Sequence, residues 1–185
     1  MKATGIVRRI DDLGRVVIPK EIRRTMRIRE GDPLEIFTDR QGEVILKKYS
    51  PIGELGDFAE EYSEALHQNL GHIVCIADKD SIVATAGGTS RDYHEKSISP
   101  ELEQIIAGKK TVIVNGNEGT PFYSIIANEQ NTDKYSAQVI VPIISEGDPI
   151  GAVILLSKEP GVVMGDMEVK VAETAAGFLG KQMEQ

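Results

Sequence analysis

The chain is short of basic charge, cysteine and long apolar runs, and each shortage excludes a class of protein. Its 185 residues carry 21 Lys plus Arg against 29 Asp plus Glu, a formal net charge of −8. Taken whole, that charge argues against nucleic-acid binding, because phosphates attract basic proteins. A single cysteine, Cys75, excludes a disulfide framework and a cysteine-based zinc site. No apolar run reaches the roughly 18 residues that cross a membrane, and the first residues lack the apolar stretch of a signal peptide. We therefore expect a cytoplasmic protein with no membrane partner.

Signatures of catalysis are also missing. The sequence holds no Gly-x-Ser-x-Gly, no phosphate-binding Gly-Lys-Ser/Thr loop and no dinucleotide fingerprint. His67, His72 and His94 lack the spacing of metal ligands. Cys75 lies in an apolar run, which favours a buried, inert thiol. We expect no enzyme: no catalytic residue, no metal site and no known cofactor.

Basic and acidic residues are distributed unevenly along the chain, which the net charge does not show. Residues 1–50 hold 12 basic and 8 acidic side chains, a net of +4, whereas residues 51–185 hold 9 and 21, a net of −12. Charge asymmetry between halves indicates nucleic-acid binding by the basic half.

Turn-forming residues divide the chain at the same place. Ser50-Pro51 and Gly53 punctuate the sequence there. We predict an N-terminal domain over residues 1–50, a linker over 51–55 and a second domain over 56–185, with an α+β fold class overall.

The N-terminal domain is predicted to consist of short elements that cannot bury much surface alone. Below about 60 residues a chain buries too little surface for easy stability, and oligomerisation often supplies the missing core. We therefore expect a homodimer whose two chains share one core. The predicted elements are strands over 4–10 and 15–18 around a turn at 11–14, a helix over 19–27, and a hairpin of strands 34–38 and 44–48.

The second domain alternates helical and strand patterns. Apolar residues at spacings of three and four predict amphipathic helices over 53–70 and 167–183, and Ser99 with Pro100 is typical of a helix start. The predicted strands cover 72–77, 82–86, 111–114, 122–127, 137–144 and 150–157, the last two forming an antiparallel hairpin around 146–149.

Arginine dominates the basic cluster of the first thirty residues. The Arg side chain reads guanine or clamps phosphate with two parallel hydrogen bonds. A solvated basic face without a partner is the alternative at this point. The candidate DNA-binding residues are Lys2, Arg8, Arg9, Arg15, Arg23 and Arg24.

The N-terminal sequence resembles a known DNA-binding family. The run Leu13-Gly14-Arg15-Val16-Val17-Ile18-Pro19 and its surroundings over residues 4–24 and 31–49 are similar to the AbrB-type swapped-hairpin domain. The resemblance implies a homodimer whose strands interdigitate into one small β-barrel. It also implies contact with double-stranded DNA through Arg8, Arg15, Arg23 and Arg24, with Arg9 and Lys2 assisting and with readout of DNA shape.

The second domain resembles the GAF family through its central hairpin, residues 137–157. That family commonly binds small molecules between sheet and loops, so Gly87-Gly88, the 115–121 loop and the helix at Ser99 bound a candidate pocket for an unidentified ligand. A purely structural oligomerisation domain is the alternative.

The combination of an AbrB-type N-terminal domain, called the head below, with a GAF-like C-terminal domain is similar to transcription regulators that activate and repress sporulation genes. It implies a homotetramer joined through the C-terminal domain's terminal helices, and a nucleoid-associated location. The competing interpretation is an antitoxin-like interaction protein that regulates its own operon. The long, well-patterned C-terminal domain favours the regulator.

Overall fold

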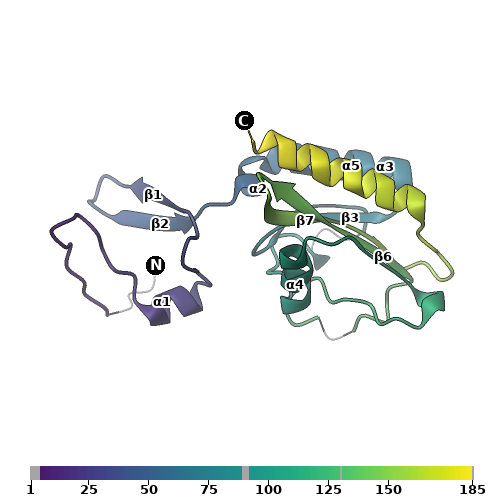
Figure 1. Cartoon of the computed structure of the whole chain (residues 1–185), viewed down its shortest axis with the longest axis horizontal. Coiled ribbons are helices and arrows are strands. Elements are labelled where there is room, and N and C mark those ends of the chain that lie inside the picture. Colours follow the sequence, from purple (N-terminus) through teal and green to yellow (C-terminus); the bar gives the residue numbers. More distant parts are fainter. Residues whose placement is uncertain (1–4, 89–91, 130, 185) are drawn as a thin grey trace. The chain divides into compact units, whose positions relative to one another are not determined.

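The structure, a computed structural model, describes residues 5–88, 92–129 and 131–184. It forms two compact units, Met1–Tyr49 and Ser50–Gln185, which Figure 1 shows in purple-blue and in teal to yellow.

The N-terminal unit contains one short helix and one hairpin. Strands β1 (Leu34–Thr38) and β2 (Val44–Lys48) are antiparallel, with Ile36 opposite Leu46, so the predicted hairpin is present. Helix α1 (Lys20–Thr25) is shorter than the predicted 19–27. It ends because Arg27 adopts a left-handed φ of 51° and the Ile28 amide then bonds the Arg23 carbonyl.

The strands predicted over 4–10 and 15–18 are wrong for the single chain. The described residues 5–10 and 15–18 have no strand structure, although the turn between them is present and Gly14 takes a positive φ of 77°. A strand needs a neighbour to satisfy its backbone groups, and β1 and β2 pair only with each other. The β-forming residues of these two segments therefore lie outside the sheets of the described chain.

None of the described residues 5–49 is buried. Large apolar side chains project into solvent instead, including Val7 at 88% exposure and Leu13 at 70%. Ile36 and Leu46 lie on one face of the hairpin and are both exposed. A water-soluble fold does not leave so many apolar groups uncovered without a partner surface.

The C-terminal unit is built on a five-stranded antiparallel sheet in the order β4-β3-β7-β6-β5. The central hairpin is longer than predicted, because Asp148 and Pro149 belong to its second strand and only Glu146 and Gly147 form the turn. The strands are β3 (Ile73–Asp78), β4 (Ile82–Ala86), β5 (Val112–Asn115), β6 (Ala137–Ser145) and β7 (Asp148–Ser157).

Helices cover both faces of this sheet. Helices α3 (Gly56–Leu70) and α5 (Asp166–Gln182) lie side by side on one face, and α4 (Pro100–Gly108) lies on the other (Figure 1). All three match predicted helices. One apolar core lies under α3 and α5, and a second, which includes Cys75, Tyr93, Tyr135 and Ile154, lies under α4.

Two glycines allow backbones to approach closely within the α3–α5 layer. A Cβ at Gly180 of α5 would lie 2.1 Å from the carbonyl oxygen of Ile144 in β6. A Cβ at Gly151 of β7 would lie 2.0 Å from the carbonyl oxygen of Ala77. Each contact is with backbone, so neither position has room for a side chain.

The C-terminal unit begins at a residue that is tied to the sheet. The Ser50 hydroxyl donates to a carboxylate oxygen of Asp78 at 2.7 Å and accepts from the Gly53 amide, which caps helix α2 (Pro51–Glu54). Ile52 of this helix is fully buried in the core under α3 and α5. The segment 51–54 is therefore helical and packed.

The strand predicted over 122–127 is wrong. This segment is irregular apart from a single bridge at Ile126, because side chains bind its backbone groups in place of a neighbouring strand. The side-chain amide of Gln138, which is fully buried, bonds both the amide and the carbonyl of Tyr123 at 3.0 Å. Carboxylates of Glu101 and Glu129 accept from the amides of Ser124 and Ile125.

Candidate nucleic-acid interface

The candidate DNA-binding arginines lie on the turn segment and on α1. Arg8 and Arg9 are exposed in the segment before the turn, and Arg15 is exposed just after it. Arg24 is exposed on α1, whereas Arg23 is half-buried there. Lys2 lies outside the described residues.

The candidate arginines differ in the ion pairs that they form within the chain. Arg15 donates through Nε to Asp11 at 2.9 Å, and the Asp11 carboxylate also accepts from the Arg15 amide at 2.7 Å. These hydrogen bonds lower the pKa of Asp11 below its usual value, so the ion pair persists at neutral pH. Among the described residues, Arg8, Arg9 and Arg24 form no ion pair.

Arg23 differs from these arginines because it has a buried hydrogen-bond donor without an acceptor among the described residues. Its Nε is buried and has no hydrogen-bond partner in the described part of the chain. A buried donor without an acceptor costs free energy, which a phosphate or carbonyl oxygen from outside the chain would recover.

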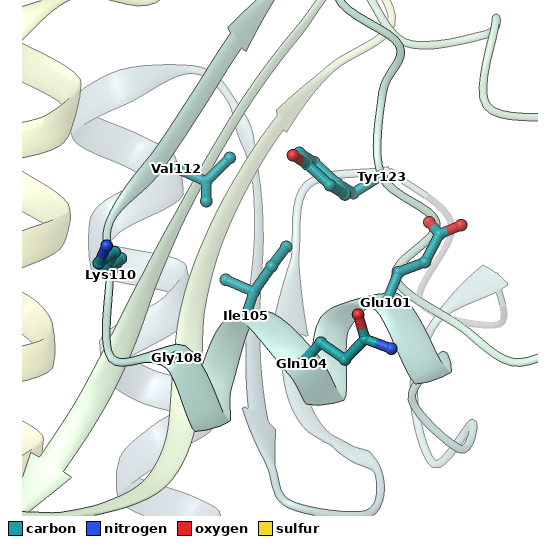
Figure 2. Close-up of a pocket in the computed structure, with 7 residues that line it drawn as sticks. All are labelled: Glu101, Gln104, Ile105, Gly108, Lys110, Val112 and Tyr123. Atoms are coloured by element: carbon teal, nitrogen blue, oxygen red, sulfur yellow. The ribbon is translucent and has the colours of Figure 1, made fainter.

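The C-terminal unit offers a separate, solvent-open pocket of about 310 Å³ beside α4 and β5. Figure 2 shows Ile105, Val112 and Tyr123 around its centre, with Lys110 at one end and Glu101 at the other. Gln104 and Gly108 complete the lining.

Of the segments expected to bound a ligand pocket, the helix at Ser99, which is α4, lines this one, whereas Gly87-Gly88 and the 115–121 loop do not. Gly87 lies against the His67 ring, Gly88 lies near Ile73, and Gly116–Glu118 form a short 3-10 helix. The sequence missed Lys110, Val112 and Tyr123, because folding brings them beside α4 and nothing in their own segments marks a pocket.

A buried carboxylate, Glu129, is a further polar feature that the sequence did not predict. Burial raises its pKa, but hydrogen bonds from Lys134, Tyr135 and the Ile125 amide outweigh burial and hold the pKa below its usual value. Burial, together with the hydrogen bonds to Glu129 and Tyr93, raises the pKa of Tyr135 far above its usual range. Cys75 lies in the same core and is fully buried, and its thiol pKa is raised to about 12.

Metal and membrane chemistry find no support in the described structure. Its residues contain no group of three or more His, Cys, Asp or Glu side chains that could hold a metal ion. None of the helices in the described part of the chain is long and apolar enough to span a bilayer.

Comparison with known proteins decides the family. Residues 54–184 match the family described as stage V sporulation protein T C-terminal, transcription factor. Stage V sporulation protein T of Bacillus subtilis is 57% identical over 185 residues, covering 100% of both chains. The chain belongs to the stage V sporulation protein T family. It is a sporulation transcription regulator.

The N-terminal matches agree with the AbrB resemblance. The transition state regulatory protein AbrB of Bacillus subtilis is 63% identical over 63 residues, which cover 31% of this chain and 65% of the relative. Residues 7–54 also match the family described as antidote-toxin recognition MazE, bacterial antitoxin. In this member of the stage V sporulation protein T family, the head therefore has the AbrB-like fold.

The C-terminal unit of this family member has the GAF fold. It superposes on the cofactor-binding GAF domain of the nutrient sensor CodY from Clostridium difficile with a TM-score of 0.51 at 19% identity, covering 67% of this chain and 83% of that one. GAF domains of other proteins superpose to a similar degree. At this identity the likeness establishes the fold alone.

Proposed function

We propose that this regulator binds promoter DNA through its N-terminal unit, with Arg8, Arg15, Arg23 and Arg24 supplying most of the contact and Arg9 and Lys2 assisting. The observation that carries the proposal is the pairing of exposed arginines with a unit of net charge +4 in an otherwise acidic chain. Two such units in a dimer double the charge presented to DNA. The acidic C-terminal unit confines that contact to the heads by repelling phosphate.

The head works as a homodimer in this proposal. The exposed apolar side chains of residues 5–49 need a core, and the β-forming segments 5–10 and 15–18, which have no strand structure in the single chain, need strand neighbours. A second copy of the chain supplies both at once, as the swapped-hairpin resemblance implies. The functional domain over residues 1–50 is then complete only as a pair. Segment 51–55 joins it to the GAF-like domain over 56–185, and within this segment helix α2 packs on the GAF-like domain.

A second association surface lies on helices α3 and α5. Phe58 and Tyr62 of α3 form a cluster with Phe178 of α5, with ring centroids 5.7–5.8 Å apart. Phe178 is 42% exposed and Met167 of the same helix is 63% exposed. Pairing through this surface joins two DNA-binding dimers into a homotetramer.

The GAF-like domain has two candidate roles, oligomerisation and the sensing of a small molecule. The fold is one in which relatives bind cofactors, as the CodY domain's description states. The regulator is expected to act in the cytoplasm, associated with the nucleoid, and without catalysing a reaction.

A salt titration of promoter binding tests the DNA proposal. Fluorescence anisotropy of a labelled promoter fragment should show affinity falling steeply with salt, since bound arginines release counterions. Arg15→Ala and Arg23→Ala should each weaken binding about tenfold or more and reduce the logarithmic salt slope by about 2, one contact from each chain of a dimer. Arg40→Ala is the matched control, because Arg40 is an exposed arginine on the β1–β2 turn outside the proposed set.

Salt-independent binding, or unchanged affinity in the two variants, contradicts the proposal. A pull-down separates the antitoxin alternative, which requires a stoichiometric protein partner. A mass measurement in solution distinguishes dimer from tetramer.

A further inference from the structure

The Glu129 carboxylate sits in a complete set of hydrogen-bond donors inside the C-terminal unit. Its side chain is only 2% exposed. One oxygen accepts from the Lys134 ammonium and from the Tyr135 hydroxyl, both at 2.6 Å. The other accepts from the Ile125 amide at 3.0 Å, with the Ser124 hydroxyl 3.3 Å away. A buried charge is stable only with such compensation.

Two ammonium groups and two aromatic rings lie around the Glu129 carboxylate. The Lys134 ammonium lies 5.0 Å from the Tyr135 ring centroid, and the Lys158 ammonium lies 5.1 Å from that of Tyr93. The hydroxyls of Tyr93 and Tyr135 are 3.2 Å apart. Asp92, 3.5 Å from Lys158, is the other carboxylate beside this group. The surroundings therefore form an anion site with two ammonium groups and two tyrosines.

The carboxylate reaches this site from a connecting segment. Glu129 follows the irregular stretch 122–127 and comes directly after Asn128, whose φ of 63° is left-handed. Its donors Lys134 and Tyr135 lie just before strand β6. Apolar side chains of the core under α4, such as Ile98, continue from Tyr135 and Tyr93.

We propose that Glu129 is a built-in ligand, filling a site in the GAF-like domain that recognises a small carboxylate with an apolar tail. The inference rests on the proposed sensing role of this domain and names its ligand class. A free carboxylate takes the same donors when the side chain of Glu129 turns out of the site, and its tail contacts the apolar core beneath α4.

The ligand needs its apolar tail because Glu129 competes with it from within the same chain. An intramolecular carboxylate has a high effective concentration at its own donors, so a free carboxylate competes only if other contacts add to its affinity. Ligand binding and release of the Glu129 side chain are then linked, because the site holds one carboxylate at a time.

Chemical rescue in the full-length chain tests the site. Glu129→Ala removes the built-in carboxylate and leaves room for a free one, so its melting temperature should fall in potassium chloride. In about 0.1 M potassium acetate at equal ionic strength it should recover by about 3 °C. Wild type should melt at the same temperature in both salts.

Two controls make the outcome specific to the site. Glu129→Gln fills the same volume with a neutral amide, so it should be destabilised and should gain nothing from acetate. Glu101→Ala removes another carboxylate that binds the same segment, at the Ser124 amide, from an exposed position, and it should also gain nothing. Glu129→Ser is the milder variant if Glu129→Ala does not fold in chloride, and the same recovery is expected of it.

Equal melting temperatures of Glu129→Ala in acetate and chloride overturn the proposal, as does an equal acetate effect on Glu129→Gln. Failure of both Glu129→Ala and Glu129→Ser to fold in either salt overturns it too. None of these measurements involves DNA, so their failure leaves the salt titration of promoter binding unaffected.

Discussion

The guanidinium of Arg15 is held by the carboxylate of Asp11, with Nε 2.9 Å from Oδ2. The other carboxylate oxygen of Asp11 accepts from the amides of Leu13 and Arg15, so the same residue shapes the turn. A DNA phosphate that binds Arg15 must therefore compete with a carboxylate of the chain itself. In the free protein, Asp11 acts as a weak internal inhibitor of one proposed contact.

Replacing Asp11 by Asn should raise the affinity for non-specific DNA a few-fold. The amide keeps an oxygen for the turn, while the loss of the negative charge frees Arg15 and adds positive charge to the head. Asp39→Asn is the matched control, because Asp39 makes the same kind of turn with the amides of Gln41 and Glu43. Anisotropy titrations with a random-sequence duplex should show a larger gain for Asp11→Asn. Equal gains would mean that net charge alone matters.

Replacing Gly180 by Ala should destabilise the C-terminal unit by roughly 2–3 kcal/mol, since α5 must move away from the Ile144 carbonyl. Gly108→Ala, at an exposed helical position where a Cβ meets nothing within 4 Å, should stabilise by about 0.5–1 kcal/mol. Urea denaturation of the two variants measures both changes. Similar stabilities would show that α5 does not need its close approach to β6.

Disrupting either proposed association surface should halve the mass of the assembly. Ile36→Asp places a charge on the exposed apolar face of the hairpin, and Phe178→Asp places one in the aromatic cluster of α3 and α5. Analytical ultracentrifugation should show dimers for each variant and single chains for the double variant. Arg40→Asp and Glu173→Lys, on the hairpin turn and on exposed α5 surface, should leave the mass of the wild type.

The Glu129 ion pair should make the stability of the C-terminal unit pH-dependent. The pKa of Glu129 is below its ordinary 4.5 in the folded chain, so its contribution is present above about pH 4.5 and is lost as the pH falls through the folded value. The ionisable groups around this site are Lys134, Tyr135 and Tyr93, with Lys158 and Asp92 next to Tyr93. The difference in melting temperature between wild type and Glu129→Gln should therefore shrink between pH 6 and pH 3. A constant difference would exclude a charged Glu129 in the folded state.

The sequence predicted elements well where they are stabilised by their own chain. Helices α3, α4 and α5 and the β6–β7 hairpin follow from apolar spacing, the Ser99 cap and continuous apolar strands, all of which are local signals. Segments 4–10 and 15–18 have the same β-forming composition, yet their neighbours are not in the single chain. Composition reports a preference for extended backbone and does not say which strand will pair with it.

Sites made by side chains from distant segments could not be predicted from the sequence. Segment 122–127 has strand-like residues, but Gln138, Glu101 and Glu129 take the backbone groups that a neighbouring strand would use. Glu129 and Lys134 look like ordinary loop charges until folding buries the carboxylate. The arginine cluster was predictable because it is concentrated in one stretch, where charge counting detects it.

In the proposed homodimer, the supply of folded heads depends on the concentration of the chain, because none of the described residues 5–49 is buried in the single chain. When a fold is completed only by pairing, the amount of folded product at low abundance grows with the square of the chain concentration, so a twofold rise in expression gives roughly four times as many working heads. Such a regulator responds to its own synthesis as a threshold device, nearly silent when scarce and quickly effective once the gene is switched on.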